Sequence, residues 1–304
     1  MKIQIGSTTV TSVYEQDVIG LSNTIPSAAP DALAELAWLD DRFVDATGEL
    51  LGVVQAFVVE HGGKLVVVDT CVGDNKENVV VPEWAHRRTG FLERFLKAGF
   101  NPADVDAVVC THLHMDHVGW NTFLDGDRWK PTFPNSRYLF ARREHDHWRA
   151  QSQSSPTDPS DVGGDLEPWA QRVSKTQVAV YQESVQPIVD AGLALLVDMD
   201  HVLVPGLRLV PTPGHTPGHV AVEITSGGEK AFLSGDSFHH PCQIAHPEWA
   251  NAADENPAAS TGTRRMVLHE LADSETLFIG SHFPEPVAGT IARDADSYRF
   301  DTRA

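Results

Sequence analysis

The stretch of sequence that decides the fold is residues 111–119, which read Thr-His-Leu-His-Met-Asp-His-Val-Gly. Four of its side chains carry imidazole or carboxylate groups that bind divalent metals: His112, His114, Asp116 and His117. Histidines two apart at the end of an apolar strand can converge on one ion if the backbone turns there. The Asp-His pair that follows can then reach a second ion. The stretch therefore predicts a metal-binding loop rather than a histidine-rich surface loop.

Three later segments supply further side chains of the same kind. Residues 212–219 contain His215, residues 232–236 end in an aspartate, and residues 277–282 end in a histidine. Each lies at or just past the end of an extended apolar or Pro/Gly-rich run, where strands of a layered α/β protein lead into site-forming loops. A zinc site needs three or four ligands, so the chain carries enough for two metals. The candidate ligands are His112, His114, Asp116, His117, His215, Asp236 and His282.

In the order of these residues the chain resembles the metallo-β-lactamase-fold superfamily of hydrolases. The pattern is His-x-His-x-Asp-His followed by a histidine, an aspartate and a histidine, and the resemblance runs from about Val53 to about Gly289. Residues 66–70 are similar to the superfamily's early strand, in which Asp69 lies beside the metal loop. The resemblance implies an α/β fold, namely an αββα sandwich of two mixed sheets flanked by helices. We expect residues 1–304 to form this sandwich as a single domain, with the metals at one rim of the sheets.

The resemblance also implies how the ligands are shared between two divalent ions. One ion would be held by His112, His114 and His215, the other by Asp116, His117 and His282, with Asp236 bridging them. Zinc is the default from the ligand types, although such sites also accept manganese, iron or cobalt. A hydroxide held between the ions at neutral pH would be the nucleophile. Asp116 would orient it or pass a proton to the leaving group.

Composition and charge restrict the partners. Hydrophobic residues make up 41% and charged residues 21% of the chain, as in an ordinary globular protein. A formal net charge of −19 argues against a nucleic-acid partner, because nucleic-acid binding depends on neutralising phosphate charge. No long apolar run and no signal-peptide pattern are present, so we expect no membrane partner and a cytoplasmic location. The widely spaced cysteines Cys71, Cys110 and Cys242 are typical of a reducing compartment.

Hydrophobic periodicity gives a coarse order of strands and helices. It predicts helices at residues 87–98 and 261–271 and strands at residues 105–111 and 276–280. The first of these strands runs into the metal loop, and the second delivers His282.

Other segments are assigned no ligand. Residues 22–48 fit a lid over the site, a homodimer arm or a helix packed on the sandwich, and residues 151–165 predict a surface loop. His145 and His147 are expected on the surface of a charged helix, because positions two apart on a helix do not face each other. His219 is expected to support the loop of residues 212–219 by hydrogen bonding.

The residues after Asp236 bear on the substrate. The superfamily's quorum-quenching lactonases usually have a tyrosine three positions after the bridging aspartate, whereas this chain has His239 there. The arrangement looks more like the methyl-parathion-hydrolase branch. We therefore predict that a small uncharged lactone or ester is hydrolysed, with phosphotriesterase side activity and with His239 as a hydrogen-bond donor to the substrate.

Other functions remain open at this point. They are a mono-iron oxygenase on the same fold, a β-lactamase-like amidohydrolase, and a non-catalytic binding module with structural metals. The last is disfavoured because structural zinc sites are usually closed by four ligands.

Overall fold

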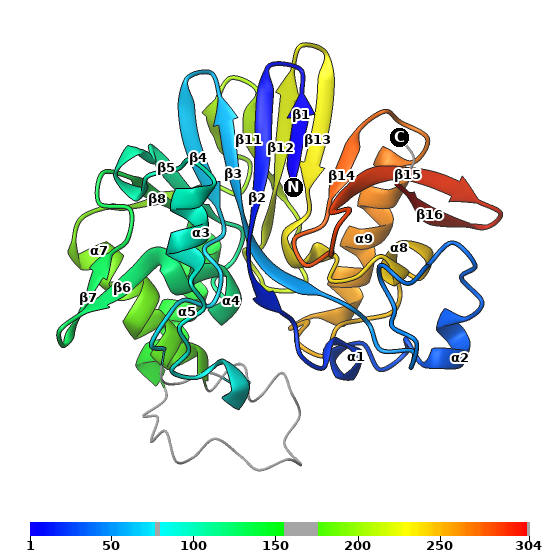
Figure 1. Cartoon of the computed structure of the whole chain (residues 1–304), viewed down its shortest axis with the longest axis horizontal. Coiled ribbons are helices and arrows are strands. Elements are labelled where there is room, and N and C mark those ends of the chain that lie inside the picture. The colour runs from blue at the N-terminus through cyan, green and yellow to red at the C-terminus, as the bar shows by residue number, and fades with distance from the viewer. Residues whose placement is uncertain (77–79, 155–175, 303–304) are drawn as a thin grey trace. The chain divides into compact units, whose positions relative to one another are not determined.

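The computed structural model describes residues 1–76, 80–154 and 176–302 (Figure 1). It contains two seven-stranded sheets and a separate two-stranded hairpin. Both large sheets contain parallel and antiparallel strand pairs, and helices connect strands along the chain. This confirms the predicted α/β class with two mixed sheets. No helix in the described ranges has the length and apolar character needed to cross a membrane.

The residues divide into two compact units. The central unit comprises Val10–Gln16 and Val54–Asp198. The other, here called the C-terminal unit, comprises Met1–Thr9, Asp17–Val53 and Met199–Ala304. The single domain expected from the sequence stays a prediction.

The first sheet comprises mostly strands of the central unit, whereas its first strand, Lys2–Ile5, falls among the residues of the C-terminal unit. In spatial order its strands are β1 (Lys2–Ile5), β2 (Thr8–Asp17), β3 (Val53–His61), β4 (Lys64–Val68), β5 (Ala107–Cys110), β8 (Arg137–Ala141) and β9 (Ala194–Val197). β5 runs parallel to both β4 and β8. The carboxyl ends of parallel neighbours meet at one edge of a sheet, so the residues after β4 and after β5 lie close together.

Helices and short turns complete the central unit. They are η1 (Pro82–Trp84), α3 (Phe91–Lys97), η2 (Pro102–Asp104), α4 (Met115–Val118), η3 (Gly119–Asn121), α5 (Arg142–Ser154), the π-helix η5 (Tyr181–Val185) and α7 (Gln186–Asp190), with the hairpin β6 (Thr122–Asp125) and β7 (Arg128–Pro131). The predicted helix at residues 87–98 begins later than expected. Gly90 has left-handed backbone angles with φ of 72°, so the helix starts at Phe91.

The second sheet belongs to the C-terminal unit. Its spatial order is β10 (Val202–Val204), β11 (Leu207–Pro211), β12 (Val220–Ser226), β13 (Glu229–Leu233), β14 (Leu277–Ile279), β15 (Ala288–Asp294) and β16 (Ser297–Asp301). β13 is antiparallel to β12 and parallel to β14. The start of β12 and the ends of β13 and β14 therefore share one edge. That geometry collects three loops far apart in the sequence.

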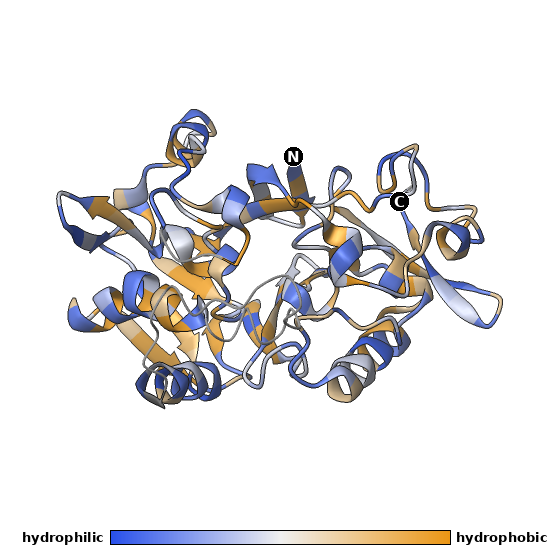
Figure 2. Cartoon of the chain, turned by 90° about the horizontal axis from the view of Figure 1, so that it is seen from below, coloured by the Kyte–Doolittle hydropathy of each residue, from blue (hydrophilic) through white to orange (hydrophobic). Residues whose placement is uncertain are grey.

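The helices of the C-terminal unit are mostly single turns. They are α1 (Leu21–Thr24), α2 (Pro30–Leu33), η6 (Gly235–Ser237), α8 (Cys242–Ala245) and α9 (Pro257–Leu271). α9 begins earlier than predicted, because the Asn256 side chain caps it by accepting from the amide of Ala259 and proline occupies its first position. Figure 2 shows hydrophobic colour along several of the strands and mixed colour along the helices, as expected for helices with one buried face.

Residues 22–48 contribute α2 and a β-bridge between Val44 and Leu50. Leu33 and Leu50 belong to a buried cluster with Trp249, so this segment packs on its own unit. The interpretation of a packed segment is thereby supported, and the lid and dimer-arm interpretations stay predictions. Of the expected surface loop 151–165, residues 151–154 are the last turn of α5 and the rest lies outside the described residues.

Candidate metal centre

The loop after β5 gathers its four candidate ligands into one group, here called the central ligand group. The ring of His112 lies with its centroid 4.6 Å from that of His114 and 4.1 Å from that of His117. α4 begins within the loop, and Asp116 Oδ1 lies 3.8 Å from His117 Nε2. The three histidines are buried. The backbone turns here, which is the condition for these side chains to converge.

Gly119 explains why the loop must turn where it does. Its amide donates to the carbonyl of Cys71 at 2.7 Å. A Cβ at this position would lie 1.7 Å from the carbonyl oxygen of Val72. The two backbones are therefore in direct contact, and only glycine fits directly after α4.

Asp69 orders the central ligand group from the end of β4. Its carboxylate accepts from Nδ1 of His117 at 2.9 Å and from the amide of Thr111 at 2.8 Å. The Thr111 hydroxyl donates to Asp69 Oδ2 at 2.9 Å and lies 3.1 Å from His112 Nδ1. A hydroxyl that donates its only proton to Asp69 can accept from His112 Nδ1–H. One buried carboxylate thus orients two ligand rings.

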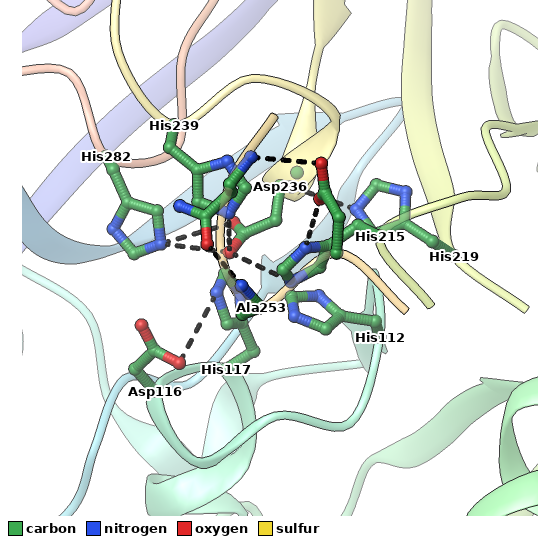
Figure 3. Close-up of polar contacts among 12 residues, drawn as sticks. His112, Asp116, His117, His215, His219, Asp236, His239, Ala253 and His282 are labelled. Atoms are coloured by element: carbon green, nitrogen blue, oxygen red, sulfur yellow. Dashed lines mark hydrogen bonds and ion pairs between the residues drawn. The ribbon is translucent and has the colours of Figure 1, made fainter. Parts of the chain in front are cut away.

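A second set of candidate ligands, here called the C-terminal ligand group, surrounds Asp236 (Figure 3). Nε2 of His215 lies 3.6 Å from Asp236 Oδ2, and Nε2 of His239 lies 3.3 Å from the same oxygen. Nε2 of His282 lies 3.2 Å from Oδ1. One donor atom each of His215, Asp236 and His239 lies within 4.8 Å of the others. His239, predicted as a substrate contact, therefore lies among metal-type donors.

A buried ion pair supports His215. Nδ1 of His215 donates to Asp254 Oδ1 at 3.0 Å, and Asp254 Oδ2 lies 3.4 Å from a guanidinium nitrogen of Arg264. Burial alone raises the pKa of Asp254, but the hydrogen bond from His215 and the nearby cations outweigh it and lower the pKa to about 2. The carboxylate is therefore charged at neutral pH. Sequence reasoning missed Asp254 and Arg264, because no local motif marks them.

His219 plays the supporting part expected of it. Its Nε2 accepts from the amide of Asp236 at 2.9 Å, and its Nδ1 lies 2.8 Å from the hydroxyl of Thr212. It thereby links the loop before β12 to the loop after β13.

The same ring nitrogen is occupied in four of the candidate ligands. Nδ1 of His117 and Nδ1 of His215 donate to carboxylates, and Nδ1 of His282 donates to the carbonyl of Val53 at 2.9 Å. Nδ1 of His112 contacts Thr111. A neutral ring that donates through Nδ1 presents the lone pair of Nε2, which is the arrangement of metal-binding histidines and their supporting acceptors. The residues present therefore fit a divalent metal.

One of the two histidines assigned to the surface is in fact buried. His145 is buried on α5, with Nε2 3.0 Å from the hydroxyl of Tyr181 on η5. Glu144, the residue before His145, is buried too and accepts from the amide of Leu113 inside the metal loop. The prediction that His145 is a surface residue is wrong because η5 covers this part of α5. His147 is half-buried.

Comparison with known sequences identifies the family. The profile of the Metallo-beta-lactamase superfamily matches residues 50–282, which span both ligand groups. The chain belongs to this superfamily. The predicted recognition is thereby confirmed, as is the prediction of a metal-dependent hydrolase.

Curated proteins are similar over most of the chain. A probable metallo-hydrolase of Mycobacterium tuberculosis is 24% identical over 251 residues, covering 75% of this chain and 74% of the relative. An N-acyl homoserine lactonase of a Bacillus species is 24% identical over 204 residues, covering 61% of this chain and 65% of the relative.

Solved structures of the superfamily confirm the fold. The hydrolase AbOPH aligns with a TM-score of 0.78 and 22% identity, covering 99% of this chain and 96% of its own. The dizinc quorum-quenching lactonase AidC aligns with a TM-score of 0.77 and 24% identity, covering 100% and 97%. The metallo-β-lactamase-type fold predicted from the ligand pattern is correct.

Proposed function

We propose that this chain hydrolyses small uncharged lactones or esters with two divalent metal ions, zinc by default. The observation that carries the proposal is a shared arrangement of His117, His215 and His282. The Nδ1 atom of each donates a hydrogen bond to an acceptor. The Nε2 atom of each lies near a carboxylate oxygen of another candidate metal ligand, Asp116 or Asp236. A dizinc lactonase and an N-acyl homoserine lactonase among the similar proteins support the same chemistry.

The ligands are assigned by their order in the superfamily pattern. We assign one ion to His112, His114 and His215, the other to Asp116, His117 and His282, and a shared role to Asp236. Divalent ions bound in this way would lower the pKa of water and polarise the carbonyl of the substrate. Imidazole and carboxylate donors suit zinc and also accept manganese, iron or cobalt.

The remaining steps fall to the protein's own side chains. Asp116 is less buried than the ligand histidines and orients the attacking water or returns a proton to the leaving alkoxide. His239 donates a hydrogen bond to the substrate carbonyl through one of its ring nitrogens. No serine or cysteine nucleophile is needed, and all three cysteines are buried.

The choice of an uncharged substrate rests on charge and on His239. The net charge of −19 repels anionic substrates at a distance. Imidazole replaces the tyrosine of the quorum-quenching lactonases, which extends the proposal to aryl esters and to side activity on phosphotriesters.

Metal analysis combined with a substrate panel tests the proposal. Purified protein should contain about two divalent ions per chain, and it should hydrolyse members of a panel of lactones, aryl esters and phosphotriesters. Removal of the metal with a chelator should abolish turnover, and added Zn²⁺ should restore it. Turnover that survives complete metal removal would overturn the mechanism, and one iron per chain with oxygen uptake would indicate an oxygenase.

A further inference from the structure

Leu113 separates the two histidines of the His-x-His pair, so its N–H belongs to the peptide after His112 and its carbonyl to the peptide before His114. Leu113 itself is fully buried. Its amide donates to Oε1 of Glu144 at 3.1 Å, and its carbonyl accepts from the side-chain amide of Gln177. Both backbone groups are therefore held by side chains from other elements, where a loop peptide would ordinarily bond to water or to its own turn.

Glu144 also holds His114 by a second route. The same oxygen, Oε1, accepts from the indole nitrogen of Trp148 at 2.7 Å, one helical turn along α5. The Trp148 ring lies edge-on to His114 with centroids 5.6 Å apart. The indole that Glu144 holds therefore packs against the His114 ring.

Burial of the Glu144 carboxylate costs free energy of desolvation. Glu144 is 1% exposed and Trp148 is 2% exposed. A buried carboxylate loses hydration that hydrogen bonds must replace, and an apolar residue of similar size could fill the same space without that cost. The benefit we identify is geometric, because rigid ligands lose less freedom when a metal binds.

We infer that Glu144 and Gln177 are positioning residues that clamp the Leu113 peptide and thereby preset His112 and His114 for metal. The inference rests on the proposed function. It predicts that loosening the clamp weakens metal binding, by an effect distinct from general destabilisation.

The test compares Glu144→Gln and Glu144→Ala with Glu15→Gln and Glu15→Ala. Glu15 is a matched control, since it is also buried in the central unit and also accepts from backbone amides, at Val72 and Gly73, and from an indole, at Trp120. None of those partners lies between ligand histidines. Dissociation constants for Zn²⁺ are measured on apo protein by competition with a chromophoric chelator, and Co²⁺ spectra report ligand geometry.

We expect the Glu144 variants to weaken Zn²⁺ binding about 10- to 100-fold, as other losses of supporting hydrogen bonds at metal sites do. They should also change the Co²⁺ visible spectrum. The Glu15 variants should lower the Tm of the apo protein about as much as the Glu144 variants do. They should leave the Zn²⁺ dissociation constant within about twofold of wild type and the Co²⁺ spectrum unchanged. Equal metal affinity in the Glu144 variants and wild type would overturn the inference.

A second variant keeps the test decisive if Glu144→Ala does not fold. Gln177→Met removes the donor to the Leu113 carbonyl with little change in volume, and it too should weaken Zn²⁺ binding. Wild-type affinity in Gln177→Met and in Glu144→Gln would reject the clamp. Wild-type protein that binds no divalent metal would instead reject the proposed function.

Discussion

Nδ1 of His215 lies 3.0 Å from Oδ1 of Asp254, and the two side chains are 1% and 0% exposed. A carboxylate in that position selects the tautomer of His215 whose Nε2 lone pair is turned toward Asp236. Because Asp254 also contacts Arg264, the support for the proposed metal ligand His215 is tied to a buried ion pair.

Replacement of Asp254 by asparagine should therefore lower both the affinity for metal and the free energy of unfolding. Loss of the charge leaves Arg264 buried without its counter-ion, which costs about 3–5 kcal/mol of unfolding free energy. Zn²⁺ affinity should fall about 10- to 100-fold. Urea denaturation and chelator competition measure the two effects. Asp273→Asn is the control, because its pair with Arg293 is more than half exposed and should contribute about 1 kcal/mol or less.

Asp69→Asn should weaken metal binding more than Thr111→Val does. Asp69→Asn disturbs the hydrogen bond to His117 and also the bond to the Thr111 hydroxyl that contacts His112. Thr111→Val removes only the hydroxyl between Asp69 and His112. Asparagine tolerates the left-handed backbone at this position, where φ is 58°, so the fold should persist. The measurement is Zn²⁺ affinity of both variants, and equal losses would contradict the dual role of Asp69.

His239→Phe should lower kcat while two metals remain bound. Phenylalanine keeps an aromatic ring but removes the proposed donor to the substrate carbonyl, a loss of about 10²-fold if the bond forms in the transition state. Metal content must be measured on the same sample, because His239 Nε2 is 3.3 Å from Asp236. Lost metal would make His239 a ligand, and unchanged turnover would remove it from the mechanism.

Acidification should destabilise the protein through His240. Burial lowers the pKa of His240 to about 4, although its hydrogen bond to the Phe43 carbonyl opposes the shift. Nε2–H donates to that carbonyl, and Nδ1 accepts from the amide of Cys242, so the ring is neutral when folded. Since the unfolded pKa is about 6.5, the unfolded chain takes up more protons below that pH. The stabilisation is complete above pH 6.5 and is lost as the pH falls toward 4, by about 3 kcal/mol.

His240→Phe is the variant that isolates this contribution. The slope of unfolding free energy between pH 6.5 and pH 4 should be shallower in the variant than in wild type, because other histidines titrate equally in both. Identical slopes in urea titrations would show that His240 does not cause the acid sensitivity.

The ligand pattern predicted the fold because its information is local. His112 to His117 occupy one loop, and strands of few residues deliver Asp236 and His282 to an edge set by parallel pairing. The pattern of hydrophobic residues therefore suffices to predict the strands that lead to the ligands, at residues 105–111 and 276–280, and the motif places the ligands after them.

The supporting residues were beyond such reasoning because their partners are remote. Asp254 meets His215 across 39 positions, and Glu144 meets Leu113 across 31. The charged sequence of α5 also gives no local sign that η5 covers it, so His145 was wrongly predicted to be exposed. Strands β1 and β2 were not predicted, because apolar and polar residues are mixed in both and neither contains an apolar run.

The backbone contact between Gly119 and Val72 has a consequence for the mutability of the chain. Any other amino acid at position 119 adds a Cβ that would clash with the backbone of residues 72–73. Substitution there therefore requires the backbone of that turn to move. Phe123, four residues further along and 37% exposed, has no such restriction. Substitutions should therefore be tolerated at position 123 and rejected at position 119.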